Sequence, residues 1–231
     1  MTKRPRVICH MMTSIDGRIV PTDWPLAPEA RKQYEIIHAS YEADAWMCGR
    51  ITMEPFAKAL RPDAQLAREH SGAPREDFIA PGEHESFALA VDPRGRLAWE
   101  SGDLDGDHVV AILSQRVSDE CLTFLRERGV SYLFAGDRDV DLASALTKVA
   151  ERFGVATLML EGGGRINGGM LQAGLIDELS VLVAPVVDGR MDTPALFDID
   201  GGGFSPIGLR LEAVEQRAAD VLWLRYRTAS A

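Results

Sequence analysis

The sequence contains no long hydrophobic run. None of its apolar segments reaches the roughly 18–20 residues that a transmembrane helix needs. The N-terminus, MTKRPRVICHMM, is basic and then briefly apolar, without the longer apolar stretch and the small-residue cleavage site of a signal peptide. We therefore expect a cytoplasmic protein that has no membrane partner.

Positive charge and cysteine are also scarce. The chain has 25 Lys and Arg against 35 Asp and Glu, a formal net charge of −10. This balance disfavours nucleic-acid binding, which needs basic patches, although local charge can still hold a small anion. Three separated cysteines, Cys9, Cys48 and Cys121, disfavour a disulfide framework. Because CxxC, HExxH and HxE with PCxxC are absent, we predict no metal site.

The composition and the hydrophobic pattern indicate one α/β domain. The 231 residues are 46% hydrophobic and 26% charged, which suits a single globular domain over residues 1–231. Short apolar runs such as VVAIL and VATLML predict strands that are buried on both faces. Strands are predicted near residues 6–12, 45–49, 87–92, 108–113, 131–135, 156–160, 178–187, 208–217 and 220–227. Helices are predicted at 29–42, 51–59, 117–128, 141–153 and 165–173.

The order of these elements predicts a mixed sheet. Strands that alternate with helices favour parallel pairing through crossover helices. Ser118 provides capping chemistry at the start of one helix, and Gly129 ends it. The last two strands flank a polar turn at 218–220 and form an antiparallel hairpin. Residues 60–86 and 200–206 lack a period and are predicted to be loops.

One glycine-rich segment indicates a phosphate site. Residues 161–169 read EGGGRINGG and follow the apolar strand VATLML. A strand that leads through glycines into a helix allows a ligand to approach the backbone and offers it free N–H groups. The dinucleotide fingerprint GxGxxG is incomplete, because Asn167 occupies the third glycine position, and GxxxxGK[ST] is absent. The alternative is a tight strand-to-helix turn with no ligand.

Two further turns have a similar character. The stretch ADAWMCGRITME leads a strand into Gly49, Arg50 and Thr52, where a forked cation and a hydroxyl could hold phosphate. The stretch MMTSIDGRI ends a strand at a turn with Ser14 and Asp16. Two phosphate-type turns in one α/β chain predict an extended, multiply phosphorylated ligand such as a dinucleotide. Alternatively, Arg50 is a solvated surface residue, Thr52 an ordinary helix cap, and Asp16 only a turn cap.

Together the motifs resemble a known family. SIDGRI, CGRITME and EGGGRINGGMLQAGLIDELSVLVAPVVDG, in this order, resemble the dihydrofolate reductase-like superfamily, and most closely the reductase domain of the riboflavin biosynthesis deaminase–reductase. The resemblance runs from about residue 7 to residue 227. It implies a three-layer α/β fold with a central mixed, mainly parallel sheet, helices on both faces and a C-terminal antiparallel hairpin. The missing HxE and PCxxC residues imply that no deaminase domain is present.

The resemblance also implies a cofactor and its ligands. The family binds NADPH at the carboxyl ends of its central strands. By this resemblance Gly49, Arg50 and Thr52 lie along the adenosine phosphate and the pyrophosphate. A second set of residues lies under the pyrophosphate and towards the nicotinamide: Gly162, Gly163, Gly164, Arg165 and Ile166. The resemblance also implies a cis peptide bond between Gly162 and Gly163.

The implied function is a hydride transfer. We expect an NADPH-dependent oxidoreductase acting on a small heterocyclic or ribityl-type substrate, as in the riboflavin-pathway 5-amino-6-(5-phosphoribosylamino)uracil reductase. Ser14, Asp16, Trp24 and Glu161 are predicted to line the substrate cleft, with Trp24 able to stack on a planar ligand. Asp16, Glu161 or an ordered water would deliver the proton.

Other interpretations stay open. A non-catalytic nucleotide- or flavin-binding module of the same fold would need only the phosphate turns. A dihydrofolate reductase would need a carboxylate on the first helix, and Glu29 and Glu35 do not match that position. The resemblance also implies a homodimer, whose surface we predict to include the strand LSVLVAPVV and the terminal hairpin.

Overall fold

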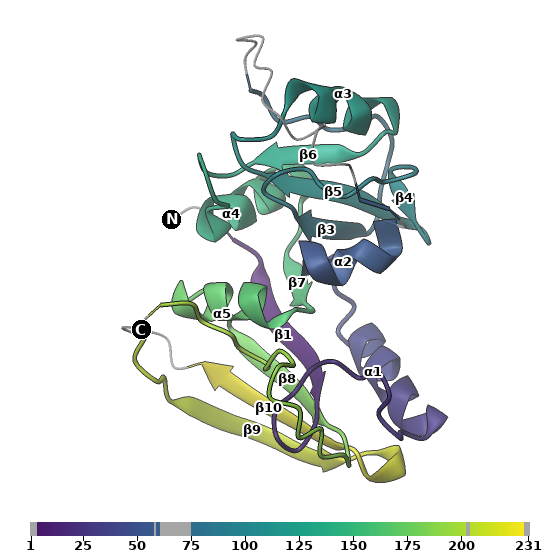
Figure 1. The fold of residues 1–231 in the computed structure, drawn as a ribbon, viewed down its shortest axis with the longest axis vertical. Helices are drawn as coiled ribbons and strands as arrows, with labels where there is room; N and C mark the ends of the chain where they lie inside the picture. The colour runs from purple at the N-terminus through teal and green to yellow at the C-terminus, as the bar shows by residue number, and fades with distance from the viewer. Residues whose placement is uncertain (1–3, 58, 61–74, 202–203, 229–231) are drawn as a thin grey trace. The chain divides into compact units, whose positions relative to one another are not determined.

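The computed structural model describes residues 4–57, 59–60, 75–201 and 204–228. The chain divides into two compact units, one formed by Met1–Pro5 and Asp44–Ala156 and the other by Arg6–Ala43 and Thr157–Ala231 (Figure 1). Most of the loop predicted at 60–86 and part of the one at 200–206 lie outside the described residues. That the chain is one domain stays a prediction.

The first unit contains a mainly parallel sheet. Its strands follow the order β4-β5-β3-β2, and β6 pairs with β5. All of these pairs are parallel except the short β4–β5 pair. The elements are β2 (Ala45–Gly49), α2 (Arg50–Ala57), β3 (Phe87–Val91), β4 (Asp103–Leu104), β5 (Asp107–Leu113), α3 (Asp119–Glu127), β6 (Ser131–Phe134) and α4 (Leu142–Phe153).

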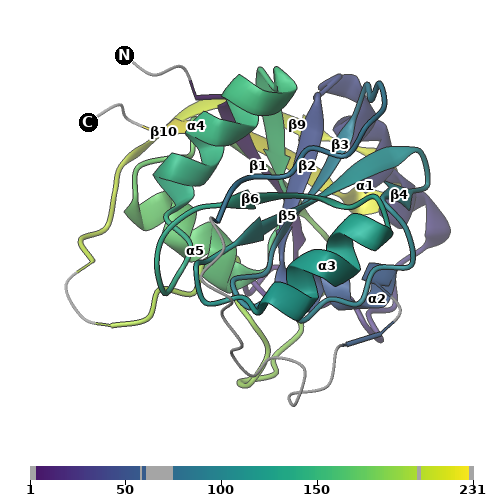
Figure 2. The same ribbon diagram turned by 90° about the horizontal axis from the view of Figure 1, so that it is seen from above.

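Helices cover both faces of this sheet. Ala88 and Ala90 of β3 pack in one core cluster with buried residues of α2 and α3. Phe87 points to the opposite face, because successive strand residues alternate, and its ring lies 5.0 Å from that of Phe153 in α4. Figure 2 accordingly shows α3 and α4 on different sides of β5 and β6.

The second unit contains the N-terminal strand and the C-terminal hairpin. Its strand order is β7-β1-β8-β10-β9, in which β1 pairs in parallel with both β7 and β8. β10 is antiparallel to β8 and to β9. The elements are β1 (Arg6–Thr13), α1 (Pro28–Ser40), β7 (Thr157–Leu160), α5 (Gly164–Gln172), β8 (Glu178–Val183), β9 (Leu209–Gln216), the short helix η2 (Ala218–Asp220) and β10 (Leu222–Thr228).

Most element predictions are confirmed, and local chemistry explains them. The Ser118 side chain accepts a hydrogen bond from the Cys121 amide at the start of α3. Gly129, just beyond that helix, has the positive φ of +64° that glycine tolerates. The hairpin turn has its own left-handed residues, Ala219 and Asp220.

One strand was predicted too long, and one strand was missed. β8 ends at Val183 rather than at residue 187, since the amide of Ala184 makes the last bond to β1 and Pro185 has no N–H to continue the ladder. β4, a strand of only two residues, was not predicted. It is too short to produce a hydrophobic period.

A buried polar chain crosses the core of the second unit. The Nε2 atom of His10 lies 3.2 Å from the carbonyl oxygen of Tyr34, and its Nδ1 lies 3.0 Å from Ser180 Oγ. Because a carbonyl only accepts, Nε2 carries the proton and Nδ1 accepts from the hydroxyl. The indole N–H of Trp223 donates to the same hydroxyl oxygen at 2.8 Å. Burial lowers the pKa of His10 to about 4, so the ring is neutral at pH 7.

This shift predicts an acid-sensitive core. His10 has a pKa of about 4 when folded and an ordinary value of 6.5, so the unfolded chain binds the extra proton between these values. The free energy of unfolding is therefore unaffected by the titration of His10 above pH 6.5. It decreases by about 3 kcal/mol as the pH falls from 6.5 to 4. Chemical denaturation at a series of pH values measures this loss. His10→Gln should flatten the dependence in this range, and identical slopes for both proteins would contradict the assignment.

Candidate functional site

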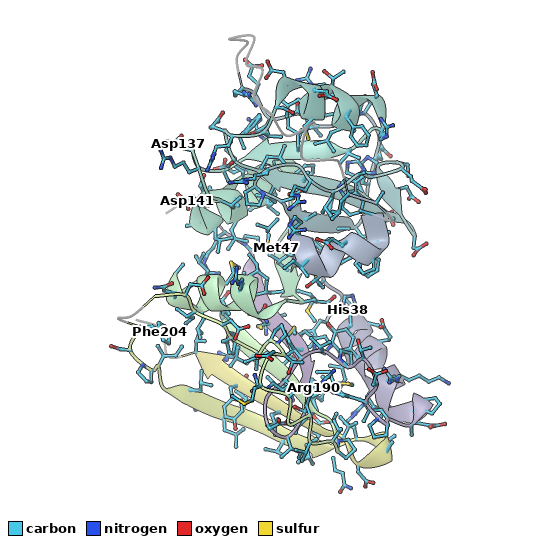
Figure 3. The ribbon with its side chains drawn as sticks, viewed as in Figure 1. His38, Met47, Asp137, Asp141, Arg190 and Phe204 are labelled. Atoms are coloured by element: carbon cyan, nitrogen blue, oxygen red, sulfur yellow. The ribbon has the colours of Figure 1, made fainter. Side chains whose placement is uncertain are left out.

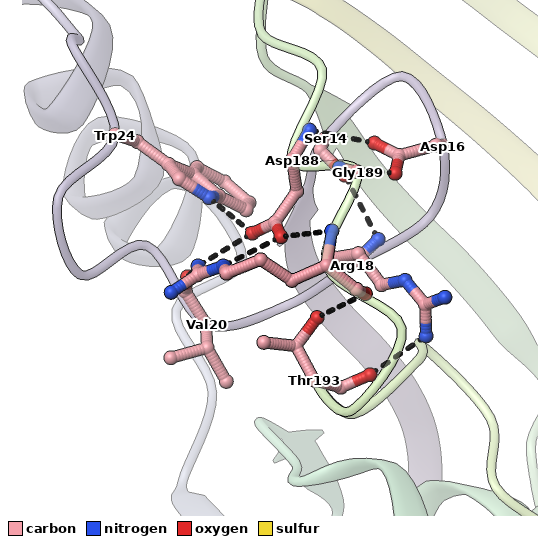
Figure 4. A network of polar contacts seen from close by, with 9 residues as sticks. Ser14, Asp16, Arg18, Val20, Trp24, Asp188, Gly189 and Thr193 are labelled. Atoms are coloured by element: carbon pink, nitrogen blue, oxygen red, sulfur yellow. Dashed lines mark hydrogen bonds and ion pairs between the residues drawn. The ribbon is translucent and has the colours of Figure 1, made fainter.

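The turn after β1 carries two of the predicted substrate residues, and both contact the chain itself. Ser14 Oγ accepts a hydrogen bond from the Arg18 amide at 2.9 Å. The Asp16 carboxylate accepts bonds from the amides of Asp188 and Gly189, each at 2.9 Å (Figure 4). These amides, with Asp188 foremost, lower the pKa of Asp16 to about 2. The ionised Asp16 therefore ties this turn to the loop after β8.

The low pKa of Asp16 bears on its predicted role as a proton donor. A carboxyl group that donates a proton near neutral pH needs a raised pKa. The two backbone amides instead stabilise the anion of Asp16, which disfavours proton donation at neutral pH; a catalytic role of Asp16 stays a prediction. Its carboxylate lies in an exposed turn, and a role in binding substrate as an anion stays a prediction.

Trp24 belongs to the same network. Its indole N–H donates to Asp188 Oδ2 at 2.7 Å, and Arg190 donates to both oxygens of the same carboxylate at 2.7 and 2.6 Å. Arg190 is the main reason that the pKa of Asp188 lies well below its ordinary range. Only 5% of Trp24 is exposed, so its predicted contact with a planar ligand would have to be made through that small area.

Asp188 and Arg190 were missed in the sequence, although a signal for them exists. The loop after β8 contains Asp-Gly-Arg at 188–190, the same tripeptide that the turn after β1 contains at 16–18. Arg18 completes the link by donating to the carbonyl oxygen of Thr193 at 2.7 Å (Figure 4). The paired tripeptides hold the two loops together.

Glu161 has a different partner from the other predicted substrate residues. It directly follows β7, and its Oε1 lies 2.7 Å from Nδ1 of His38 in the last turn of α1. The Glu161 side chain is 13% exposed and that of His38 is 31% exposed. Figure 3 labels His38 on this helix. The sequence gives no signal for this pair, because 123 residues separate its members.

The glycine segment has the expected backbone. The peptide bond between Gly162 and Gly163 is cis, as the resemblance implied, and Gly162 has a φ of +89°. Gly163 is the N-cap of α5, which begins at Gly164. The first amides of such a helix have no partner within the helix and can face an anion. Binding of a cofactor by these three glycines stays a prediction.

Part of the need for glycine comes from the protein itself. A β-carbon on Gly164 would lie 2.3 Å from the carbonyl oxygen of Ala195, and one on Gly168 would lie 2.3 Å from that of Asp198. The buried Asn167 fixes the same loop by donating to the carbonyl oxygen of Leu196 at 3.0 Å. The loop of residues 195–198 thus packs directly on the start of α5. At Gly164 and Gly168 the close neighbour is this loop.

The other predicted cofactor ligands of this segment are more open. Arg165 is exposed, and its guanidinium lies 3.8 Å from the exposed carboxylate of Asp200, a separation at which a surface ion pair contributes little. Ile166 is half-buried in the first turn of α5. Both residues stay predicted cofactor ligands.

The first unit holds the second predicted phosphate turn. Gly49 ends β2 and Arg50 begins α2, where its side chain contacts Glu54 one turn later. Thr52 lies inside the first turn of this helix and is half-buried, so it does not occupy the cap position. The buried Asp92 follows β3. Burial raises its pKa, and the Leu97 amide and then the charge of Arg50 oppose that rise. Phosphate binding by Gly49, Arg50 and Thr52 stays a prediction.

Over the described ranges, no group of three His, Cys, Asp or Glu side chains could hold a metal ion. No helix in that part of the chain is long and apolar enough to cross a bilayer.

Comparisons with known proteins agree on one family. A family model described as the RibD C-terminal domain matches residues 5–223. The chain is 30% identical, over 211 residues, to the 2,5-diamino-6-ribosylamino-4(3H)-pyrimidinone 5′-phosphate reductase of Methanothermobacter thermautotrophicus, with 90% of this chain and 91% of that protein covered. The protein of the same name from Archaeoglobus fulgidus is 28% identical over 202 residues, with 84% and 87% covered.

A solved structure confirms the fold. The pyrimidine reductase-like protein from Corynebacterium diphtheriae superimposes with a TM-score of 0.73, covering 98% of this chain and 93% of that one, at 18% identity. At this identity the likeness concerns the fold. The predicted dihydrofolate reductase-like architecture, with mainly parallel strands, flanking helices and a C-terminal antiparallel hairpin, is confirmed.

The contact between α5 and the 195–198 loop predicts the effect of adding one methyl group. Gly168→Ala should lower the free energy of unfolding by about 1–3 kcal/mol, since a backbone carbonyl oxygen occupies the place of the new carbon. Gly208→Ala is the matched control, because a β-carbon there meets nothing within 4 Å. Chemical denaturation compares the two variants. Equal stabilities would show that the loop does not require glycine at this position.

Proposed function

Because the chain belongs to the RibD C-terminal domain family, we propose that it is a nicotinamide-dependent reductase of riboflavin biosynthesis that reduces the ribosylamino group of a pyrimidine. The observation that carries this proposal is the match to a named reductase over nine-tenths of both chains. The location of Glu161 at the end of β7, directly before the cis glycine pair, supports it.

The printed names of the relatives favour one substrate. Two relatives matched over most of their length are named for 2,5-diamino-6-ribosylamino-4(3H)-pyrimidinone 5′-phosphate. We propose this compound as the substrate. The deaminated 5-amino-6-(5-phosphoribosylamino)uracil is the alternative, and the two differ in one exocyclic group of the pyrimidine ring.

We propose NADPH as the cofactor. When bound, a nicotinamide supplies the hydride. The start of α5 fits such a group, because its first amides can face a pyrophosphate and the exposed Arg165 side chain adds positive charge. In the first unit, Gly49, Arg50 and Thr52 are the proposed ligands of the adenosine phosphate.

The chemistry of the substrate indicates what the protein must provide. Opening of the ribosylamine ring gives an imine, whose carbon accepts a hydride and whose nitrogen accepts a proton. The protein must therefore orient the imine and manage that proton. Of the two carboxylates predicted to act here, Glu161 is the better candidate, since the amides of the loop after β8 hold Asp16 as an anion.

An assay of NADPH oxidation tests the function. The protein should consume NADPH with the diaminopyrimidinone phosphate and more slowly with its deaminated counterpart. Dihydrofolate is the control for a dihydrofolate reductase, and a fluorescence titration with FMN is the control for a flavin-binding module. Tight FMN binding without any response to NADPH would overturn the proposal.

Arg50 should distinguish the two nicotinamide cofactors, because only NADPH carries the 2′-phosphate. Arg50→Ala should weaken NADPH binding about tenfold to a hundredfold, since a charged hydrogen bond to phosphate contributes about 1.5–3 kcal/mol. It should change NADH binding by less than about twofold. Arg152→Ala removes an exposed arginine of α4 and is the control. Equal losses for both cofactors would contradict the role of Arg50.

We propose that the protein acts in the cytoplasm as a homodimer. A bulge at Glu212 shifts the register of the terminal hairpin and keeps the exposed Leu209, Leu211 and Val214 on one face with Leu222. Such an exposed apolar face is typical of an interface. The other predicted part of the surface, β8, is largely buried between β1 and β10, so the hairpin is the proposed contact.

Light scattering after size-exclusion chromatography tests the dimer. The wild type should have the mass of two chains, and Leu211→Glu should shift it towards one chain because it buries a charge in the contact. Arg210→Glu is the control, since residue 210 points to the other face of β9. A monomeric wild type would contradict the proposal.

A further inference from the structure

We propose that His38 is a positioning residue that orients the Glu161 carboxylate for reduction of the substrate. The inference rests on the proposed function and extends it to a residue that the sequence motifs do not include. His38 acts through Glu161 and is not assigned any contact with the substrate.

The geometry of the pair supports this role. Nδ1 of His38 lies 2.7 Å from Oε1 of Glu161, a distance typical of a charge-assisted hydrogen bond. When this carboxylate is ionised it only accepts, and Nδ1 then carries the hydrogen of the bond. This bond restricts rotation of the Glu161 side chain about its last torsion, which is otherwise broad. The carboxylate is thus presented in one orientation where β7 ends, the edge at which α/β sheets bind ligands.

Of the two neighbouring histidines, His10 and His38, it is His38 that contacts Glu161. The neighbouring ring of His10 has its centroid 6.3 Å from that of His38. Both ring nitrogens of His10 are engaged, with Ser180 and with the carbonyl oxygen of Tyr34, and burial keeps this ring neutral. His10 therefore neither competes for the carboxylate nor repels a protonated His38.

Other polar groups of this region have partners of their own. The hydroxyl of Tyr34 donates to the carbonyl oxygen of His10 at 3.2 Å. The hydroxyl of Tyr41, at the end of α1, donates to Glu178 at 2.6 Å, and Arg6 also contacts that carboxylate. Cys9 is buried, and burial raises its pKa, so it stays a neutral thiol. The carboxylate that Nδ1 of His38 contacts is that of Glu161.

Two substitutions at His38 separate positioning from packing. His38→Asn keeps an N–H near the place of Nδ1, whereas His38→Leu keeps the bulk and removes the donor. We expect His38→Leu to lower kcat about tenfold to a hundredfold with the diaminopyrimidinone phosphate, and His38→Asn to stay within about threefold of the wild type. The Kd for NADPH should change by less than about twofold in both. Lys32→Asn, at an exposed position of the same helix, should match the wild type.

A double-mutant cycle with Glu161→Gln tests whether His38 acts through Glu161. If it does, adding His38→Leu to Glu161→Gln should lower kcat by less than about twofold more. Fully additive losses would overturn the inference, and so would a His38→Leu protein with the kcat of the wild type. If His38→Leu does not fold, failure of His38→Asn to keep kcat within about threefold of the wild type overturns it instead. A wild type that reduces neither pyrimidine would overturn the proposed function as well.

Discussion

The parallel pairing of β1 with both of its neighbours is the constraint on which the candidate site depends. β1 lies between β7 and β8 and runs in the same direction as both. Parallel strands bring their carboxyl ends to one edge of a sheet. The turn of Ser14 and Asp16, the Glu161–Gly163 segment and the loop after β8 all leave from that edge. The contact of Asp16 with the loop after β8 and the place of Glu161 follow from that arrangement.

The edge is built from two kinds of polar contact with different consequences. Backbone amides hold the Asp16 carboxylate, which makes it a rigid anchor with a low pKa. A side chain from another element holds the Glu161 carboxylate, so its orientation depends on where α1 lies. The first contact fixes the shape of the loops, and the second is the one through which we propose that His38 orients Glu161.

The sequence predicted what local periodicity and capping determine. The apolar runs gave the strands that both units use, Ser118 gave a helix start, and the polar turn near residue 219 gave the hairpin. The resemblance added the cis peptide at Gly162. Each of these features is contained in a short stretch of chain or in a motif.

What the sequence did not predict depends on contacts between distant segments. The carboxylate of Asp16 bonds to an amide 173 residues away, and Glu161 pairs with a histidine 123 residues earlier. Neither distance leaves a pattern in a single sequence. Trp24 was predicted to contact a ligand because aromatic rings can stack on planar molecules, and the sequence did not show that its indole N–H donates to Asp188. Only the fold decides between such partners.

The close packing of the 195–198 loop on α5 bears on how glycine-rich motifs are interpreted. Gly164 and Gly168 are small because a neighbouring carbonyl oxygen occupies the space of their missing β-carbons. A motif search that scores such glycines as a nucleotide signature would therefore also select chains in which packing alone requires them. A homologue of this chain that has lost its cofactor would be expected to keep both glycines for as long as it keeps that loop.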